Sequence, residues 1–359
     1  MKSNKTNERL INMNKIKLLV VCGGQSTEHS VSRMSCTSVC KHLNEDKYDI
    51  DLVAIDKDGK WYLVDDYKKD LTKENWLSGT SEIHDLLGFI KGHDVVLPIL
   101  HGLYGEDGTI QGLFELANVP YAGCRVLGSS VAMDKIYTKM IFDQAGIAQV
   151  KSLYVKKRYD GKFVVVDKEF NEHEDVEEQI ITKLGLPCFV KASNSGSSVG
   201  CYKVTKKEEL MDRLKEAGKY DRKIVVEEGI NCTELECAVL GNDDPKASLV
   251  GEILPAGDFY TFESKYEDEN SKTRAPANVS DEVTNYIRTT AVRAFKAIDG
   301  HGLSRVDFFL DKDTGKVYLN EINTMPGFTN ISMYPQLWDK TGIEYSELLD
   351  QIIQLAFER

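Results

Sequence analysis

The first apolar run of the chain ends in a pair of glycines, and this combination restricts the possible folds more than any other stretch of the sequence. Residues 16–21 read IKLLVV, Cys22-Gly23-Gly24 follow, and residues 30–43 carry apolar side chains at helical spacing. A second apolar run covers residues 50–55. This order of strand, glycine turn, helix and strand predicts an α/β fold.

The same order of elements returns in the next part of the chain. Residues 95–100 read as a strand, 101–108 as a loop with three glycines, and 109–117 as a helix. We therefore expect the first domain, residues 15–128, to be an open α/β sheet.

Two polar residues, Glu28 and His101, each follow a strand of this predicted sheet. Ligands of open α/β sheets bind beyond the carboxyl ends of the strands, so both residues are candidates for ligand binding. Two alternatives stay open, since His101 could be a structural histidine and Glu28 could stabilise the start of its helix. The Cys22-Gly23-Gly24 turn lacks the full G-x-G-x-x-G pattern, so support for a dinucleotide site is weak.

The remainder of the chain mixes helices and strands less regularly. Residues 129–223 and 224–359 are predicted to form two smaller α+β modules, and a long polar loop, 254–277, interrupts the second. The predicted helices cover residues 129–145 and 280–298; a charged linker covers 167–178; the predicted strands cover 151–155, 188–192, 224–228, 234–240, 248–253, 303–310 and 316–322.

The charge of the chain argues against nucleic acids and anionic membranes as partners. Its formal net charge is −12, whereas binding to a phosphate backbone relies on clustered Lys and Arg. No apolar run approaches the about 18 residues that a membrane span needs, and residues 1–14 are polar, so we expect a cytoplasmic protein with a short N-terminal tail. The eight cysteines form no C-x-x-C pair and are expected to be buried free thiols.

A predicted hairpin near the C-terminus carries the strongest chemical signal. Arg305 and Asp307 are two residues apart on its first strand, as are Glu321 and Asn323 on its second, so each pair shares a face. Pairing across the turn near Asp313 would bring the two sets together. Two carboxylates and a carboxamide make a hard oxygen site suited to Mg²⁺ that also binds nucleotide phosphates. The alternative is a solvated hairpin face.

Two loops have the composition of nucleotide-binding segments. The stretch Lys191–Gly200 follows a strand and offers small residues whose backbone N–H groups could surround a phosphate, with Lys191 as a point charge. The loop 254–277 is too long for a passive connection and holds aromatic and charged residues, which is typical of a lid. Ordinary turns and a passive insertion remain the alternatives.

Six segments stand out in the chain: GGQSTEHSVS (23–32), LHGLYGEDGTIQGLFEL (100–116), MDK (133–135), KASNSGSSVG (191–200), SRVDFFL (304–310) and NEINTMPGFTNISMYP (320–335). Together, and in this order, they resemble the D-alanine:D-alanine ligase family of ATP-grasp enzymes, and the resemblance extends from about Lys15 to Arg359. One small departure is Ala192, where the family commonly has proline. The resemblance implies an open α/β domain followed by an ATP-grasp fold of two α+β subdomains.

The resemblance also implies a role for each matching residue. Amino acid substrates would contact Glu28, His101, Arg305, the Gly327 backbone, Ser332 and Met333; Ser197 and Tyr266 would tie the lid loop to Glu28. ATP would contact Lys135, Lys191, Ser197, Glu227, Ile230, Glu234 and Lys265, and two Mg²⁺ (or Mn²⁺) ions would be held by Asp307, Glu321 and Asn323.

The implied activity is ATP-dependent ligation of two D-alanines through a D-alanyl phosphate, for peptidoglycan precursor synthesis, by a homodimer. Ligases of this kind that prefer D-serine carry arginine at the position of Met333, so the resemblance favours D-alanine as acceptor. D-serine as acceptor, or a nucleotide-binding regulator without turnover, are the alternatives. The implied partners are small molecules, ATP and D-alanine.

Overall fold

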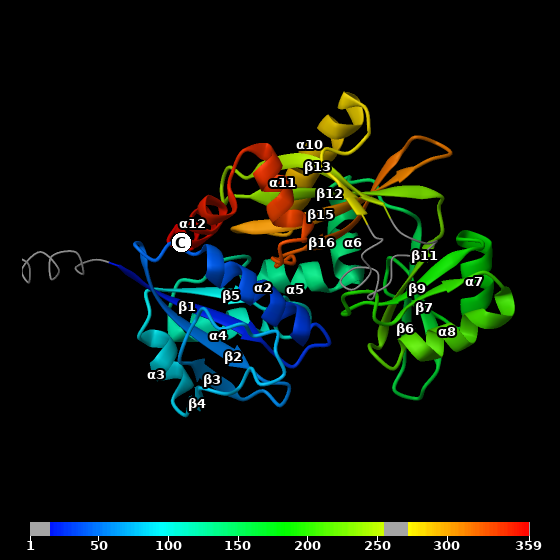
Figure 1. Ribbon diagram of the computed structural model, residues 1–359. Coiled ribbons are helices and arrows are strands. Elements are labelled where there is room, and N and C mark those ends of the chain that lie inside the picture. The colour runs from blue at the N-terminus through cyan, green and yellow to red at the C-terminus, as the bar shows by residue number, and fades with distance from the viewer. Residues whose placement is uncertain (1–14, 255–271, 359) are drawn as a thin grey trace, which may run out of the picture.

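The structure is a computed structural model that describes residues 15–254 and 272–358. The described residues form three β-sheets with helices packed around them (Figure 1). This arrangement confirms the predicted mixed α/β and α+β class. The predicted tail, 1–14, and most of the predicted lid loop lie outside the described residues.

The first sheet is the predicted open α/β sheet. Its central strand β1 pairs in parallel with β2 on one side and with β5 on the other, and these three strands are the ones predicted from the apolar runs of this domain. Two antiparallel strands, β3 and β4, extend the sheet at the β2 edge. The strand order is β4-β3-β2-β1-β5, formed by β1 (Ile16–Gly23), β2 (Tyr48–Ile55), β3 (Trp61–Val64), β4 (Thr80–Glu82) and β5 (Val95–Ile99).

Helices cover both faces of this sheet. Alternate β1 residues enter two different apolar clusters, since Leu18 and Val20 pack with Val39 of α2, whereas Leu19 and Val21 pack with Phe114 of α4. The helices of this part are α2 (His29–His42), α3 (Leu86–Lys91) and α4 (Thr109–Ala117).

The helix predicted for residues 129–145 is in fact two helices, α5 (Val126–Met133) and α6 (Lys135–Gln144). Asp134 separates them with an extended backbone (φ −88°, ψ 98°), and its carboxylate accepts hydrogen bonds from the N–H groups of Ile136 and Tyr137. An acidic residue that caps a helix favours this break over a continuous helix. The prediction of one helix was therefore wrong.

The second sheet is antiparallel throughout, and two helices cover one face of it. The predicted charged linker 167–178 is not a linker, because it contains a short strand and begins a helix that buries Val176 and Ile180. The order is β10-β9-β11-β6-β7-β8, with β6 (Ser152–Lys157), β7 (Phe163–Val166), β8 (Glu172–His173), β9 (Cys188–Ala192), β10 (Cys201–Val204), β11 (Lys223–Glu228), α7 (Val176–Lys183), η1 (Lys207–Glu209) and α8 (Leu210–Ala217).

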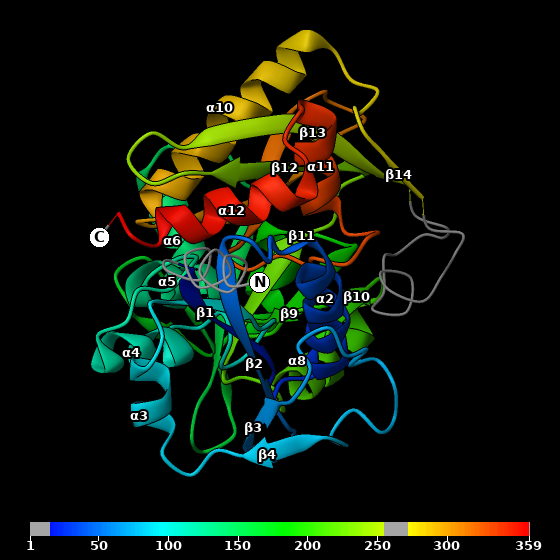
Figure 2. The ribbon, with the colours of Figure 1, turned by 60° about the vertical axis from the view of Figure 1, so that its left-hand side comes forward.

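The third sheet is also antiparallel, and helices cover its two faces (Figure 2). On β12, Cys237 and Val239 pack with α10, whereas Ala238 and Leu240 pack with the C-terminal helices. The order is β14-β13-β12-β15-β16, with β12 (Cys232–Leu240), β13 (Lys246–Leu254), β14 (Lys272–Arg274), β15 (Leu303–Asp311), β16 (Val317–Asn323), α10 (Asp281–Ala297), α11 (Met333–Thr341) and α12 (Tyr345–Leu355). The end of the predicted lid loop is therefore strand β14.

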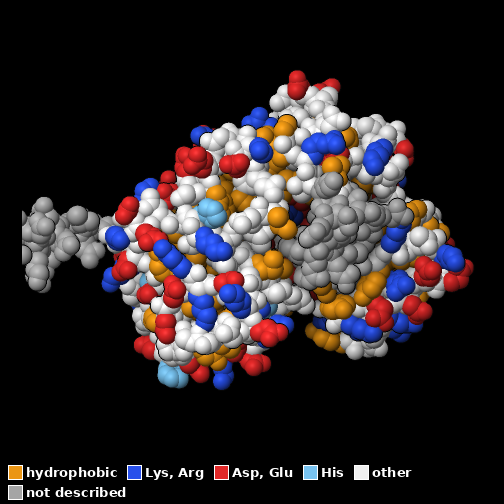
Figure 3. Space-filling model, in the orientation of Figure 1, with side chains coloured by type: hydrophobic (Ala, Val, Ile, Leu, Met, Phe, Trp, Pro, Cys, Tyr) orange, Lys and Arg blue, Asp and Glu red, His pale blue; other side chains and the backbone are white. Residues whose placement is uncertain are grey.

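The surface carries charges of both signs, and the cysteines are free thiols as predicted. Acidic and basic side chains are interspersed over the face in Figure 3. All eight cysteines are free, six of them buried and two, Cys201 and Cys232, partly exposed. Within residues 15–254 and 272–358, no helix is long and apolar enough to span a membrane.

Candidate functional site

Loops and strands of all three sheets line one pocket. The first sheet contributes the residues that follow β1 and β5, the second the loop between β9 and β10, and the third the β15-β16 hairpin with the segment after it. The pocket brings together most of the site residues predicted from the sequence: Glu28, His101, Lys135, Ser197, Glu234, Arg305, Asp307, Glu321, Asn323, Gly327, Ser332 and Met333.

The β15-β16 hairpin aligns its polar residues as the strand period predicts. Arg305 lies opposite Asn323, and Asp307 lies opposite Glu321. Arg305 donates to both carboxylate oxygens of Asp307, from Nε and Nη2 at 2.7 Å each. Asn323 Nδ2 donates to Asp307 Oδ2 at 3.1 Å. Asp307 is therefore held from two sides at the floor of the pocket.

Glu236 of β12 joins this group although the sequence interpretation did not include it. Arg305 Nε lies 3.2 Å from Glu236 Oε2, and Glu236 is the neighbour of Asp307 across the β12-β15 ladder. Burial lowers the pKa of Arg305, but the carboxylates of Asp307, Glu236 and Glu321 outweigh burial and raise it well above its ordinary value. The guanidinium is thus a permanent positive charge in the pocket.

The hairpin donors fit a hard divalent cation that takes its other ligands from a substrate. Asp307, Glu321 and Asn323 line one pocket and offer only oxygen ligands from carboxylate and carboxamide groups. Among the described residues, no group of three or more His, Cys, Asp or Glu side chains is arranged to hold a metal. Mg²⁺ needs about six oxygen ligands, so phosphate and water oxygens would have to complete its shell.

Across the pocket, Glu28 meets the loop between β9 and β10, residues 193–200, which we call the serine-rich loop. Glu28 is the N-cap residue of α2 but makes no side-chain cap bond, and its Oε1 instead accepts a hydrogen bond from Ser197 Oγ. A Cβ on Gly102 or Gly196 would come within 2.3 or 2.8 Å of Glu28 Oε2, so a larger residue at either position would displace this carboxylate. Ser197 and Ser198 have positive φ angles, 49° and 62°.

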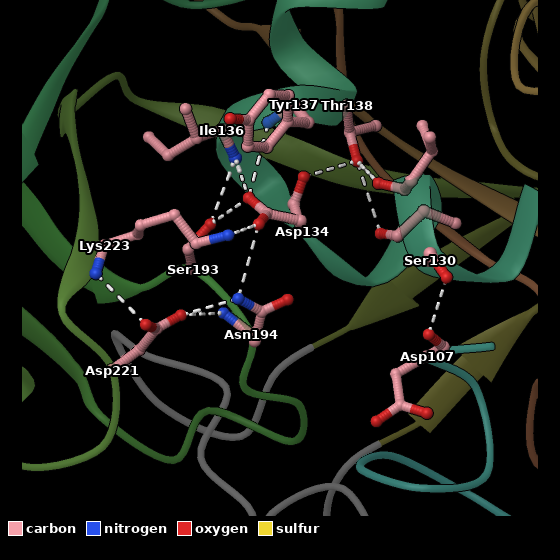
Figure 4. A network of polar contacts seen from close by, with 12 residues as sticks. Asp107, Ser130, Asp134, Ile136, Tyr137, Thr138, Ser193, Asn194, Asp221 and Lys223 are labelled. Carbon is pink, nitrogen blue, oxygen red and sulfur yellow. Dashed lines mark hydrogen bonds and ion pairs between the residues drawn. The ribbon is translucent and has the colours of Figure 1, made fainter. Parts of the chain in front are cut away.

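A polar network around Asp134 joins the start of α6 to Ser193 and Asn194 of the same loop (Figure 4). The Asp134 carboxylate accepts from Ser193 Oγ at 2.6 Å and pairs with the ammonium of Lys223. The backbone of Lys135 donates to Ser193 O, and its Nζ donates to Ser195 O at 2.5 Å. The break between α5 and α6 therefore fixes both the lysine and the root of the serine-rich loop.

A buried ion cluster lies beside the pocket. Glu227 of β11 is 4% exposed and lies 2.6 Å from both Lys191 Nζ and Lys139 Nζ. Burial would raise the pKa of Glu227, but the two lysines outweigh it and lower the pKa to about 2. Glu227, Lys191 and the partly exposed Ile230 are not among the pocket-lining residues, so their predicted contacts to ATP remain predictions.

The segment after β16 forms the far wall of the pocket. Ser332 Oγ accepts the N–H of Thr329 at 3.0 Å and lies 2.8 Å from Thr329 Oγ1. Met333 is buried and packs over Gly251 of β13, where a Cβ would lie 2.8 Å from its sulfur. Lys265 and Tyr266, both predicted to act from the lid loop, lie outside the described residues.

His101 is buried with both ring nitrogens engaged by protein atoms. Nδ1 lies 2.9 Å from Met325 O, and Nε2 lies 2.9 Å from Ser35 Oγ. Burial lowers the pKa of His101, with Glu28 opposing this effect. The ring is therefore neutral at physiological pH, and its nearest hydrogen-bond partners belong to the protein.

Four residues of this region were missing from the sequence interpretation, and each left a signal. Lys139 follows Lys135 by four residues, one helical turn; Glu236 follows Glu234 by two, on the same strand face; Asp134 and Glu106 stand inside segments that carry the resemblance. Burial and the nearby Glu28 raise the pKa of Glu106 to about 8.

Known proteins match the chain over nearly its whole length. The family models for the D-Ala D-Ala ligase N-terminus and C-terminus match residues 17–124 and 141–354. Proteins named D-alanine–D-alanine ligase from Acetivibrio thermocellus and Ruminiclostridium cellulolyticum are 48% and 47% identical, over 96% and 97% of this chain and 96% of each relative.

Solved structures agree with these matches. The D-alanine-D-alanine ligase of Coxiella burnetii has a TM-score of 0.83 at 37% identity, covering 96% of this chain and 95% of that one. The VanG D-Ala:D-Ser ligase of Enterococcus faecalis has a TM-score of 0.84 at 35% identity, covering 96% and 100%. With both family models matched and relatives near 48% identity, the chain belongs to the D-alanine–D-alanine ligase family of ATP-dependent ligases.

Proposed function

We propose that this protein joins two D-alanines to D-alanyl-D-alanine, with ATP converted to ADP and phosphate, for peptidoglycan precursor synthesis. The observation that carries the proposal is the convergence of Glu28, Lys135, Arg305 and the Asp307-Glu321 pair on one pocket. The 48% identity to a protein named D-alanine–D-alanine ligase supports the same substrates.

The reaction must overcome the low reactivity of a carboxylate toward an amine. The carboxylate of the first D-alanine attacks the γ-phosphate of ATP, which gives D-alanyl phosphate and ADP. The amine of the second D-alanine then attacks the acyl carbon, loses a proton, and expels phosphate. Glu28 would hold the ammonium of the first D-alanine, and Lys135 with the serine-rich loop would hold the ATP phosphates.

The permanent charge of Arg305 and the Gly327 backbone would stabilise the oxyanion that forms at the acyl carbon. Asp307, Glu321 and Asn323 would hold two Mg²⁺ or Mn²⁺ ions, which when bound neutralise charge on the phosphates. Lys191, Glu227, Ile230 and Glu234 would contact the nucleotide, and Lys265 and Tyr266 would act from the lid loop.

The second candidate acceptor is D-serine, because the fold is also similar to that of a D-Ala:D-Ser ligase. The wall at Met333 is apolar and buried, and the neighbouring Ser332 hydroxyl is bonded to Thr329. An acceptor hydroxyl would lack a partner on this wall, which favours D-alanine.

The test is phosphate release and dipeptide formation from ATP, Mg²⁺ and D-alanine, with D-serine in a parallel reaction. One D-alanyl-D-alanine per ATP consumed supports the proposal. ATP binding without any D-alanine-dependent phosphate release would show a nucleotide-binding regulator instead, and faster turnover with D-serine would change the acceptor.

We further propose that the enzyme is a cytoplasmic homodimer. The strongly exposed leucines Leu116 and Leu127, 79% and 61% exposed, lie on α4 and α5, which contact each other (Figures 1 and 2). Large apolar side chains on neighbouring helices are typical of a protein–protein surface, and a second copy of the chain is the partner we propose.

A further inference from the structure

The segment 325–328, which contains Gly327, is held by hydrogen bonds from the loop that follows β5 and from helices α2 and α12. On one side, the Met325 N–H donates to Glu106 Oε2 at 3.1 Å, and Met325 O accepts from the His101 ring at 2.9 Å. Both backbone groups of one residue are therefore bound by the loop that follows β5.

The other side of Gly327 is held in the same way. The Phe328 N–H donates to Ser35 Oγ of α2 at 3.1 Å, and Phe328 O accepts from the hydroxyl of Tyr345 at 2.6 Å. Ser35 is fully buried and also contacts His101 Nε2, so its hydroxyl links the two sides.

Each partner is itself fixed. Glu106 Oε1 accepts the N–H of Gly102 at 2.8 Å, and His101 O accepts from Ser26 Oγ at 2.7 Å. Ser26 Oγ in turn accepts the N–H of Glu28 at 2.9 Å. The loop that carries the proposed substrate carboxylate, Glu28, and the segment that carries Gly327 are thus parts of one hydrogen-bonded unit.

We propose that Glu106, His101 and Ser35 form a backbone clasp that positions the Gly327 N–H for the reaction, so that His101 acts through Met325 rather than by touching substrate. They are positioning residues. The inference rests on the proposed role of the Gly327 backbone at the oxyanion.

The geometry explains why these residue types are needed. A donor held at the oxyanion acts fully only if its position is fixed before the reaction, because reorganisation would reduce its benefit. Either protonation state of Glu106 offers an acceptor oxygen to the Met325 N–H, so the clasp does not depend on the charge of this carboxyl.

The experiment compares Glu106→Ala, Glu106→Gln and a matched control, Asp56→Ala. Asp56 also accepts two backbone N–H groups, those of Asp58 and Lys60, but in a surface turn of the first sheet. For each full-length variant, kcat for dipeptide formation, KM for ATP and Tm are measured after the wild type has been shown to form dipeptide.

We expect Glu106→Ala to lower kcat by roughly 10- to 100-fold with KM for ATP within about threefold of wild type, because a displaced oxyanion donor acts late in the reaction. Glu106→Gln keeps one acceptor oxygen and should recover part of kcat. Asp56→Ala should retain wild-type kcat. Ser35→Ala should act in the same direction as Glu106→Ala, and the double variant should lose less than the product of the two single losses.

The proposal is overturned if Glu106→Ala matches Asp56→Ala, if Gln recovers nothing, or if the Ser35 and Glu106 losses multiply independently. A wild-type protein that makes no dipeptide would instead overturn the proposed function, which keeps the two failures distinct.

Discussion

Met333 is the residue through which we expect the enzyme to select its second amino acid. It is buried at the start of α11, where its side chain packs over Gly251 and lines the pocket. An unpaired hydroxyl costs about 1–3 kcal/mol, so kcat/KM for D-serine should be roughly 10- to 100-fold below that for D-alanine. Met333→Arg adds donors at this wall and should narrow the ratio. The measurement is kcat/KM for D-alanine and for D-serine in the wild type and in Met333→Arg. An unchanged ratio of the two values would show that Met333 does not determine acceptor selectivity.

A substitution of Glu321 tests whether this residue is a ligand of the proposed metal ions. Glu321→Gln removes a charged oxygen ligand from the pocket, and turnover should fall about 100-fold or more while Tm stays near that of the wild type. Asp313→Asn, in the exposed turn of the same hairpin, is the control and should be fully active. Titration of Mn²⁺ in the presence of ADP should show weaker binding for Glu321→Gln alone. Equal Mn²⁺ affinity in all three proteins would contradict the assignment.

Glu227 has a predicted effect on stability that is independent of catalysis. Its pKa in the folded protein, about 2, is below the ordinary value of 4.5. The ionised carboxylate therefore stabilises the fold above pH 4.5, and this contribution is lost as pH falls from 4.5 toward 2. Glu227→Gln leaves Lys139 and Lys191 unpaired and should reduce the free energy of unfolding by about 3–5 kcal/mol at pH 7.

Urea denaturation measures this effect against Glu228→Gln, the adjacent residue. Glu228 pairs with Lys151, whose side chain is 72% exposed, so that substitution should cost less than about 1 kcal/mol. The loss in Glu227→Gln should be constant between about pH 7 and pH 5 and begin to shrink below about pH 4.5. A loss no larger than that of Glu228→Gln would mean that the ion cluster contributes little to stability.

At the scale of elements, we expect the break between α5 and α6 to matter for ATP binding, because it positions Lys135 and the serine-rich loop. Asp134→Ala removes the cap of α6 and the partner of Lys223, and thereby loosens both Lys135 and the serine-rich loop. We expect KM for ATP to rise about tenfold, since the two groups that would hold phosphates lose their common support. Asp85→Ala removes a comparable cap from α3, which is outside the pocket, and should leave KM for ATP unchanged. Equal KM values would show that Asp134 matters only for folding.

The helices and strands that were predicted well are those in which the buried side chains give the sequence a regular spacing of apolar residues. The strand 188–192 and the helix 109–117 have the predicted bounds, because mostly apolar runs and amphipathic patterns bounded by turn residues are local signals. The prediction of one helix for residues 129–145 missed the Asp134 cap, although its bonds to Ile136 and Tyr137 are local; the contacts of the same carboxylate with Ser193 and Lys223 are distant in the chain and left no local signal. The helix of residues 176–183 was not predicted because its charged residues outnumber the few that it buries.

The same distinction applies to the pocket. The β15-β16 hairpin could be predicted because strand period and turn together determine which residues share a face. The contact of Glu28 with Ser197 depends on two loops about 170 residues apart, so only the resemblance indicated it. No local pattern indicated that His101 would be hydrogen-bonded to Ser35 and Met325, because Ser35 is 66 residues away in the chain and Met325 is 224 residues away, after the third sheet's strand β16.

At the scale of the whole molecule, the first and third sheets share one apolar cluster. Leu18 of β1 and Val39 of α2 belong to the same buried cluster as Trp338 of α11 and Ile353 of α12. The second sheet has a cluster of its own, built from residues between 155 and 226. The clasp on segment 325–328 therefore lies within a continuous core, whereas the serine-rich loop belongs to a separately packed unit.

The last prediction concerns the assembly of two such molecules through α4 and α5. A stable dimer buries about 1,200–2,000 Å² in total, which requires several apolar side chains from each copy. Leu116 and Leu127 supply the largest exposed apolar groups of these two helices, and Val126, 39% exposed, directly precedes Leu127. Because a twofold interface uses the same surface on both copies, charges introduced there would face each other across the axis.

The variant Leu116→Lys with Leu127→Lys should therefore be monomeric at concentrations where the wild type is dimeric, as measured by light scattering on a sizing column. Tyr159→Lys replaces a side chain that is 91% exposed in the turn between β6 and β7, and this variant should remain dimeric. Since neither Leu116 nor Leu127 lines the pocket, we expect the monomeric variant to unfold cooperatively on heating and to keep most of its turnover. A wild type that is monomeric at micromolar concentration would refute the homodimer, and a double-lysine variant that stays dimeric would place the interface elsewhere.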